Sequence, residues 1–178
     1  MSEYYFNTGN IYEWVSTLRA GDRVYLSGVV YTARDAAHKR IVQMLDSGEA
    51  LPFDINGSVV YFAGPTPAKG ELAIGSVGPT TSSRMDCFSP RMLSLGQKAM
   101  IGKGNRNQKV VDSMVENGAV YFAAVGGAGA LYSGCIRSCR VVGFDDLGCE
   151  SVKELVVEDF PLLVAIDSQG NSLYNKLR

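Results

Sequence analysis

Short apolar, β-rich segments alternate with helical patterns along this chain, and that alternation limits the fold more than any other feature. Helical spacing of apolar residues predicts one helix that starts near Asp35 and a second over residues 108–116. A short helix of small residues is expected after Gly126. Strands that alternate with helices indicate an α/β or mixed α+β domain. The expected strands are residues 24–31, 58–63, 73–77, 99–101, 119–125, 140–144 and 162–166.

Length and charge narrow the possible functions. The 178 residues suffice for one core, and no repeat or clear linker divides them, so we expect a single domain over residues 1–178. Seventeen Lys and Arg against eighteen Asp and Glu give a net charge of −1, which argues against a nucleic acid or an anionic membrane as partner. Residues 1–10 carry neither a basic nor an apolar stretch, so we expect no secretory signal and a cytoplasmic location.

Three polar segments, residues 32–38, 78–86 and 101–104, each follow an apolar segment. Each supplies one cation beside small residues, whose backbone N–H groups can approach a ligand. The cations are Arg34, Arg84 and Lys103. Open α/β sheets collect ligands at strand ends, and two Arg with one Lys suit a small dianion. The pattern predicts a small polyanion site and does not separate a dicarboxylate from a phosphate.

Nucleotide-binding fingerprints do not fit these segments. Gly127-Ala-Gly129 needs a glycine at position 132 to complete GxGxxG, but Tyr132 is there. Gly102-Lys103 lacks the preceding glycine of a P-loop, since Gln97 holds that position. Both dinucleotide and P-loop sites are therefore disfavoured.

Each candidate residue also has an ordinary structural explanation. Arg34 and Asp35 suit a helix-start charge and its cap. His38, one turn later, is typical of a solvated or hydrogen-bonded surface group. Thr80 would be an ordinary turn residue and Lys103 a loop tip. These explanations hold singly, but they account poorly for the combination.

The four cysteines favour reduced structural thiols over a metal site. Cys135 and Cys139 have CxxxC spacing, but no CxxC accompanies them and the chain has a single His. The other two cysteines are Cys87 and Cys149. We therefore expect no metal bound by this chain alone.

Long motifs in the chain resemble a known family. These are TARDAAHKR (32–40), GPTTSSRMD (78–86), IGKGN (101–105), YFAAVGGAGAL (121–131) and the stretch from 147 to 174. They look like the C-terminal domain, or the separate beta subunit, of class I iron–sulfur fumarate hydratases. The resemblance covers, in order, nearly the whole chain after about residue 12. It implies a single domain of the swivelling β/β/α type.

The resemblance also implies a partner and a reaction. The partner is an alpha subunit whose three cysteines hold a four-iron four-sulfur cluster, in a heterotetramer of two alpha and two beta chains. The reaction is the reversible hydration of fumarate, a small dicarboxylate, to malate. Residues 32–38, 78–86 and 101–105 would face the alpha subunit, because half of an active site must face the other half.

Carried over by motif, the resemblance assigns roles to the candidate residues. Arg34, Arg84 and Lys103 would bind the substrate carboxylates, with Thr81 beside them. Thr80 would transfer the carbon proton, which requires a desolvated site with adjacent cations, because a threonine hydroxyl is a poor base. His38 is the other acid–base candidate, since the reference pKa of histidine suits proton transfer near neutral pH.

Three alternatives stay open. An L-tartrate dehydratase beta subunit belongs to the same superfamily, although the segments ending at Asp86 and Leu131 look closer to fumarase. A mesaconate- or citraconate-type hydratase is another. A non-catalytic anion-binding interaction domain is the alternative from a different class, and the intact set of Thr80, Arg84 and Lys103 argues against it.

Overall fold

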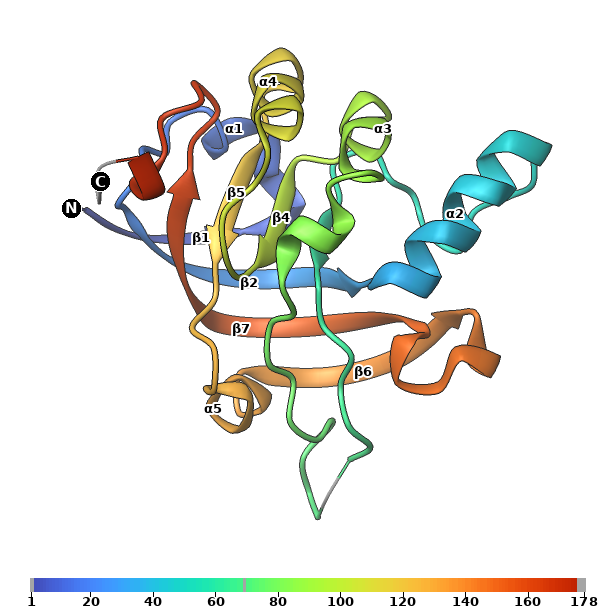
Figure 1. The fold of residues 1–178 in the computed structure, drawn as a ribbon. Coiled ribbons are helices and arrows are strands. Elements are labelled where there is room, and N and C mark those ends of the chain that lie inside the picture. The colour runs from blue at the N-terminus through green and yellow to red at the C-terminus, as the bar shows by residue number, and fades with distance from the viewer. Residues whose placement is uncertain (1, 69, 176–178) are drawn as a thin grey trace.

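The computed structural model describes residues 2–68 and 70–175 (Figure 1). The strands of this part form one seven-stranded sheet in the order β1-β2-β3-β4-β5-β7-β6. The strands are β1 Glu3–Asn7, β2 Arg23–Thr32, β3 Val59–Tyr61, β4 Ala99–Gly102, β5 Val120–Ala123, β6 Ile136–Gly143 and β7 Val152–Ile166. The helices are α1 Ile11–Trp14, α2 Asp35–Ser47, α3 Ser89–Ser94, α4 Gln108–Asn117 and α5 Gly129–Ser133.

The sheet closes into a ring because β2 also pairs with β7. Strands β2, β3, β4 and β5 run parallel to their neighbours in that order, and antiparallel β7 joins β5 back to β2. The remaining strands extend the ring at its sides, β1 along β2 and β6 along β7. The predicted mixed α/β fold is confirmed.

Alternation along the parallel strands separates two hydrophobic clusters. In β3, Tyr61 joins a cluster that draws residues from all five strands of the ring, whereas its neighbours Val60 and Phe62 join a second cluster. That second cluster contains residues of α2, α3 and α4. In Figure 1, α3 and α4 lie above β4 and β5, and α2 continues from the end of β2. Both faces of these strands are therefore buried, as is usual for parallel strands.

Helices α2 and α4 have different starts. Asn107 caps α4 by accepting a hydrogen bond from the Val110 N–H at 3.0 Å. Arg34 holds the equivalent position before α2 and makes no side-chain cap. Asp35 was expected to cap or to charge this helix start, and the second role is the one found: it lies inside the first turn, where the helix dipole favours a negative charge.

Two segments differ from the expected strands. Residues 73–77 are not a strand: Ile74 is buried, but the segment belongs to a loop held by hydrogen bonds from Thr66 to Ser76 and from Gly75 to Thr66. β7 begins at Val152, well before the expected residue 162, and carries a register shift opposite Gly28. No helix of the described residues is long and apolar enough to cross a membrane.

Candidate functional site

Backbone hydrogen bonds bring the predicted polar segments to one edge, at the carboxyl ends of the parallel strands. The Thr80 N–H donates to the Phe62 carbonyl beyond β3 at 2.7 Å, and the Thr80 carbonyl accepts from the Lys103 N–H at 3.3 Å. The Ser82 N–H then donates to the Lys103 carbonyl at 2.9 Å. Thr80 and Lys103 are therefore fixed to the same edge by the main chain rather than by flexible side chains.

Arg84 and Asp35 connect the second polar segment to the first. Arg84 Nε donates to one oxygen of Asp35 at 3.0 Å, and Arg84 Nη2 lies 2.9 Å from the other. The Nε contact is a hydrogen bond, whereas the Nη2 contact is an ion pair only, because that Asp35 oxygen has no hydrogen-bond partner among the described residues. Because Asp35 directly follows Arg34, the segments that carry the two candidate arginines lie side by side.

Arg34 is held by contacts that its sequence position does not suggest. Its Nη2 lies 3.1 Å from Oε1 of Glu150, and both side chains are 23% exposed. The guanidinium also lies against Gly64, where a Cβ would approach Arg34 Nη1 to 2.9 Å. A glycine at position 64 therefore makes room for this side chain.

Lys103 is exposed and lies next to the glycine turn that follows β5. A Cβ on Gly126 would be 3.7 Å from Lys103 Cδ and 4.0 Å from Nζ. Thr81, also exposed, bridges to Lys103 in parallel register. One side of the edge thus presents an ammonium and a threonine hydroxyl to solvent.

His38 differs from the expected surface group. Its side chain is buried, with its ring 5.6 Å from that of Phe62 and 5.7 Å from that of Phe88. Nδ1 lies 2.9 Å from the Arg34 carbonyl, so in the neutral ring this nitrogen carries the proton. Burial lowers the His38 pKa to about 4, and the charge of Arg106 acts in the same direction. The argument from the reference pKa was therefore wrong for this ring.

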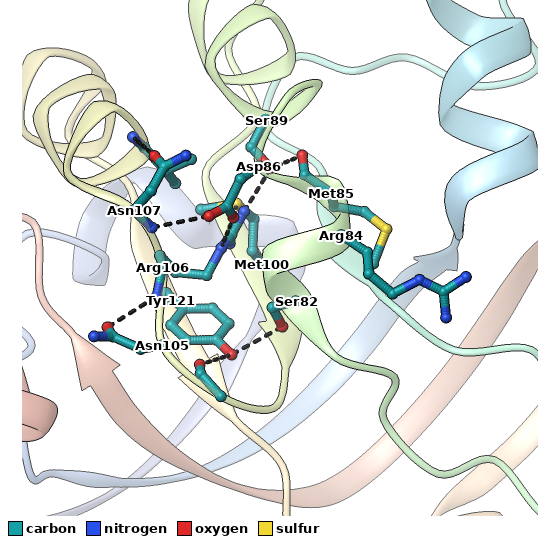
Figure 2. A network of polar contacts seen from close by, with 12 residues as sticks. Ser82, Arg84, Met85, Asp86, Ser89, Met100, Asn105, Arg106, Asn107 and Tyr121 are labelled. Atoms are coloured by element: carbon teal, nitrogen blue, oxygen red, sulfur yellow. Dashed lines mark hydrogen bonds and ion pairs between the residues drawn. The ribbon is translucent and has the colours of Figure 1, made fainter.

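A buried ion pair beneath the edge was missed from the sequence (Figure 2). Arg106 has a fully buried side chain, and its Nε donates to Asp86 at 2.6 Å. Arg106 Nη2 donates to Ser89 Oγ at 2.6 Å, and the other Asp86 oxygen accepts from the Asn107 N–H at 2.8 Å. In Figure 2 Arg84 points away from this network. The pair joins the 78–86 segment to the loop that carries Lys103.

Tyr121 of β5 supports the same two segments. Its hydroxyl donates to the Gly104 carbonyl at 2.8 Å and lies 2.9 Å from Ser82 Oγ. Ser82 reaches this position because Gly102 has no side chain; a Cβ there would lie 1.9 Å from Ser82 Oγ. The Arg106 guanidinium packs over the ring of Tyr121, 5.1 Å from its centroid.

The cysteines do not form a ligand set in the described part of the chain. All four are free thiols: Cys87 and Cys149 are exposed, and Cys135 and Cys139 are partly buried. Among residues 2–68 and 70–175, no three His, Cys, Asp or Glu side chains are grouped as a metal site requires. Burial raises the pKa of the Cys135 and Cys139 thiols, which makes both weaker metal ligands.

A model of the family described as fumarase C-terminus matches residues 3–177. The chain belongs to the fumarase C-terminus family. The chain is 44% identical to a protein provisionally named L(+)-tartrate dehydratase subunit beta from Methanocaldococcus jannaschii, over 92% of this chain and 87% of that protein. It is 38% identical to fumarate hydratase 2 of Leishmania major and 36% identical to the aerobic class I fumarate hydratase of Escherichia coli. The resemblance seen in the motifs is confirmed.

The fumarase C-terminus chain matches these relatives over different shares of their length. It covers 87% of the Methanocaldococcus jannaschii subunit but only 29% of each of the two fumarate hydratases. The matched part of this chain is 91% for the Leishmania major enzyme and 88% for the Escherichia coli enzyme. It therefore corresponds to a whole small subunit in one relative and to one part of a longer chain in the others. The names of all three relatives are those of hydro-lyases.

Proposed function

We propose that this chain is the beta subunit of a two-subunit iron–sulfur hydro-lyase that adds water reversibly to a small dicarboxylate, fumarate, to give malate. The observation that carries the proposal is the edge described above. The main chain fixes Thr80 to Lys103, and Asp35 joins the segments of Arg34 and Arg84, in a member of the fumarase C-terminus family.

The three cations would bind the two carboxylates of the substrate. Asp35 demonstrates that Arg84 can meet a carboxylate, through a hydrogen bond from Nε and with Nη2 close to the second oxygen. Arg84 is 49% exposed on its side chain, so a substrate carboxylate can reach it from outside. Lys103, whose backbone N–H donates to the Thr80 carbonyl, would supply a point charge that stabilises the dianionic intermediate left when the carbon proton departs.

Thr80 is the proposed proton-transfer residue of this chain. Its backbone is held on both sides, by Phe62 and Lys103, so its side chain has a defined direction. The hydroxyl needs nearby positive charge and a carboxylate from the partner to act as a base. His38 is the weaker candidate, because a buried ring with a pKa of about 4 is a poor base at neutral pH. Its Nδ1–H instead supports the Arg34 carbonyl.

The cluster would belong to the partner. The thiols of the described residues do not form its ligand set, so we propose a cluster-bearing alpha subunit and a heterotetramer of two alpha and two beta chains. When bound, its open iron supplies the Lewis acid that activates the hydroxyl. Free thiols also suit a reducing compartment, and we propose the cytoplasm.

The partner would cover the edge that carries the candidate residues. Lys103 and Thr81 are exposed there, and Val125, just after β5, is 69% exposed. Leu131, beyond the same glycine turn, is 66% exposed. Large apolar side chains beside an open polar site are typical of a surface that another chain covers.

A second substrate has specific support. The identity to the Methanocaldococcus jannaschii protein, named for L(+)-tartrate, exceeds that to either fumarate hydratase quoted above. L-Tartrate is also a small dicarboxylate, so the same three cations suit it. The two substrates differ at the carbons between the carboxylates, which the partner subunit would contact.

Co-expression with the cluster-bearing partner tests the proposal. The complex, with its iron and sulfide content measured, is assayed on fumarate, malate, L-tartrate and mesaconate. Turnover of fumarate supports the first candidate, and turnover of L-tartrate alone supports the second. A fully loaded complex without activity on any of these dicarboxylates overturns the hydro-lyase proposal and favours a non-catalytic anion-binding domain.

A further inference from the structure

Glu150 makes two contacts that converge on the start of α2. It ends the 3-10 segment Asp145–Glu150, which connects β6 to β7. One of its oxygens lies 3.1 Å from Arg34 Nη2, and the other accepts a hydrogen bond from the backbone N–H of Ala36 at 3.3 Å. A single carboxylate therefore holds both the side chain of Arg34 and the first turn of the helix that follows it.

Arg34 has little else to fix its direction. Its Nε is buried and has no hydrogen-bond partner among the described residues. Its other close neighbour is Gly64, which offers space and no polar side chain. A long side chain held at one nitrogen only would sample several rotamers if that contact were lost.

We infer that Glu150 is a positioning residue for Arg34, and that it sets the affinity of the site for one substrate carboxylate. The inference rests on the proposed function, in which Arg34 binds substrate. The ion pair with Glu150 is made through Nη2, and the Arg34 side chain is 23% exposed, so part of the guanidinium stays open to a ligand.

The same contact has an opposite interpretation, in which Glu150 occupies the anion site and competes with substrate. The anchoring of Glu150 argues against it. While one oxygen faces Arg34, the second is committed to the backbone N–H of Ala36 in the first turn of α2. A carboxylate held from both sides orients its partner and does not readily leave.

Steady-state kinetics of the reconstituted complex test the inference. Glu150→Gln keeps the shape of the side chain but removes the charge and one of the two acceptors. We expect KM for the dicarboxylate to rise about tenfold, equal to about 1.4 kcal/mol, with kcat within about twofold of wild type. The matched control is Asp146→Asn in the same segment, which breaks the Arg40 pair and should leave KM unchanged.

A second substitution asks whether Glu150 acts through Arg34. In an Arg34→Ala background, Glu150→Gln should change KM by less than about twofold, because no guanidinium remains to be positioned. Full additivity of the two substitutions overturns the inference. A lowered KM in Glu150→Gln also overturns it, because it would identify Glu150 as a competitor. An unchanged KM in Glu150→Gln overturns it as well, and an equal rise of KM in Asp146→Asn would identify a general structural role of the segment instead.

A measurement that does not depend on enzyme activity distinguishes a failure of this inference from a failure of the proposed function. NMR of the folded full-length chain reports how freely the Arg34 guanidinium rotates about its Nε–Cζ bond. We expect rotation to be slow in wild type and in Asp146→Asn, and fast in Glu150→Gln. If rotation is equal in all three, Glu150 does not position Arg34. If the rates differ as expected but the loaded complex turns over no dicarboxylate, only the proposed function fails.

Discussion

Replacing Asp86 by Asn removes half of the buried ion pair beneath the candidate site. Asp86 is 7% exposed on its side chain and Arg106 is fully buried, so solvent screens neither charge. Asn at this position keeps one acceptor for two donors, the Arg106 Nε–H and the Asn107 N–H. The guanidinium then keeps its charge in the interior without a negative partner.

The expected cost is large for a change of one atom. Breaking a buried pair by removing one partner costs about 3–5 kcal/mol, against a total stability of about 5–15 kcal/mol for a domain. The hydrogen bonds of Arg106 to Ser89 and its contacts with Phe62 and Tyr121 remain, and these hold the free energy of unfolding above zero. We therefore expect a folded protein with much reduced stability.

Urea unfolding at pH 7.5 measures this cost, with the m-value checked for constancy. The matched control is Asp46→Asn, which breaks an exposed pair with Arg91 whose side chains are 62% and 41% exposed. That control should cost about 0–1 kcal/mol. The double variant Asp86→Leu, Arg106→Met removes both charges and should recover part of the loss. Equal losses in Asp86→Asn and Asp46→Asn would refute the argument from burial.

Three further predictions concern the site. Arg84→Lys in the reconstituted complex should weaken substrate binding by about 1.5–3 kcal/mol, because an ammonium cannot form two parallel hydrogen bonds; unchanged KM and kcat would contradict this. Thr80→Ala should lower turnover at least about a hundredfold with binding retained, and His38→Asn should have a smaller effect; the reverse order would transfer the proton-transfer role to His38. The His38 pKa is about 4 when folded and 6.5 for the free group, so its contribution to stability is fully present above about pH 6.5 and is lost as the pH falls toward 4. The loss of unfolding free energy should approach about 1.4 kcal/mol per pH unit and be smaller in His38→Gln, and urea unfolding across that pH range measures it. Parallel plots of unfolding free energy against pH for the two proteins would contradict a buried neutral ring.

Much of the fold follows from local patterns, and the exceptions have physical reasons. Strands β2 to β5 were predicted from short apolar, β-rich runs, and α2 from the helical spacing of its apolar residues. The parallel edge strand β1, Glu3–Asn7, was not predicted. In β7 the register shift separates Val157 from Phe160 by one extra residue, and this hides the alternation of the strand. Residues 73–77 look like a strand because they are apolar, but their apolar side chains pack a loop against the core. Neither effect is visible without the tertiary partner.

The candidate site was predictable where residues lie next to strand ends, and not where distant residues meet. Arg34 and Lys103 follow strands β2 and β4, so their common edge follows from parallel strand order, whereas the Arg84 segment is brought there by the hydrogen bonds of Thr80 and Ser82. Glu150 and Arg106 were missed because charged residues are expected to be exposed, and their partners come from other segments. The burial of His38 was missed for the same reason.

The ion pairs around the edge divide by burial into two kinds with different consequences. Asp86 and Arg106 lie beneath it, where separating them is costly, so they can hold the Thr80 and Lys103 segments in one arrangement. Asp35 and Arg84 lie at the surface, with side chains 33% and 49% exposed, where such a pair contributes only about 0–1 kcal/mol. In the proposed function, a substrate carboxylate would share or replace Asp35 on Arg84 at little cost, while the arrangement beneath it stays fixed. A site that exchanges one carboxylate for another needs an exposed pair that can open and a buried pair that stays closed. In this chain the exposed pair is made by Arg84 and the buried pair by Asp86, two residues later.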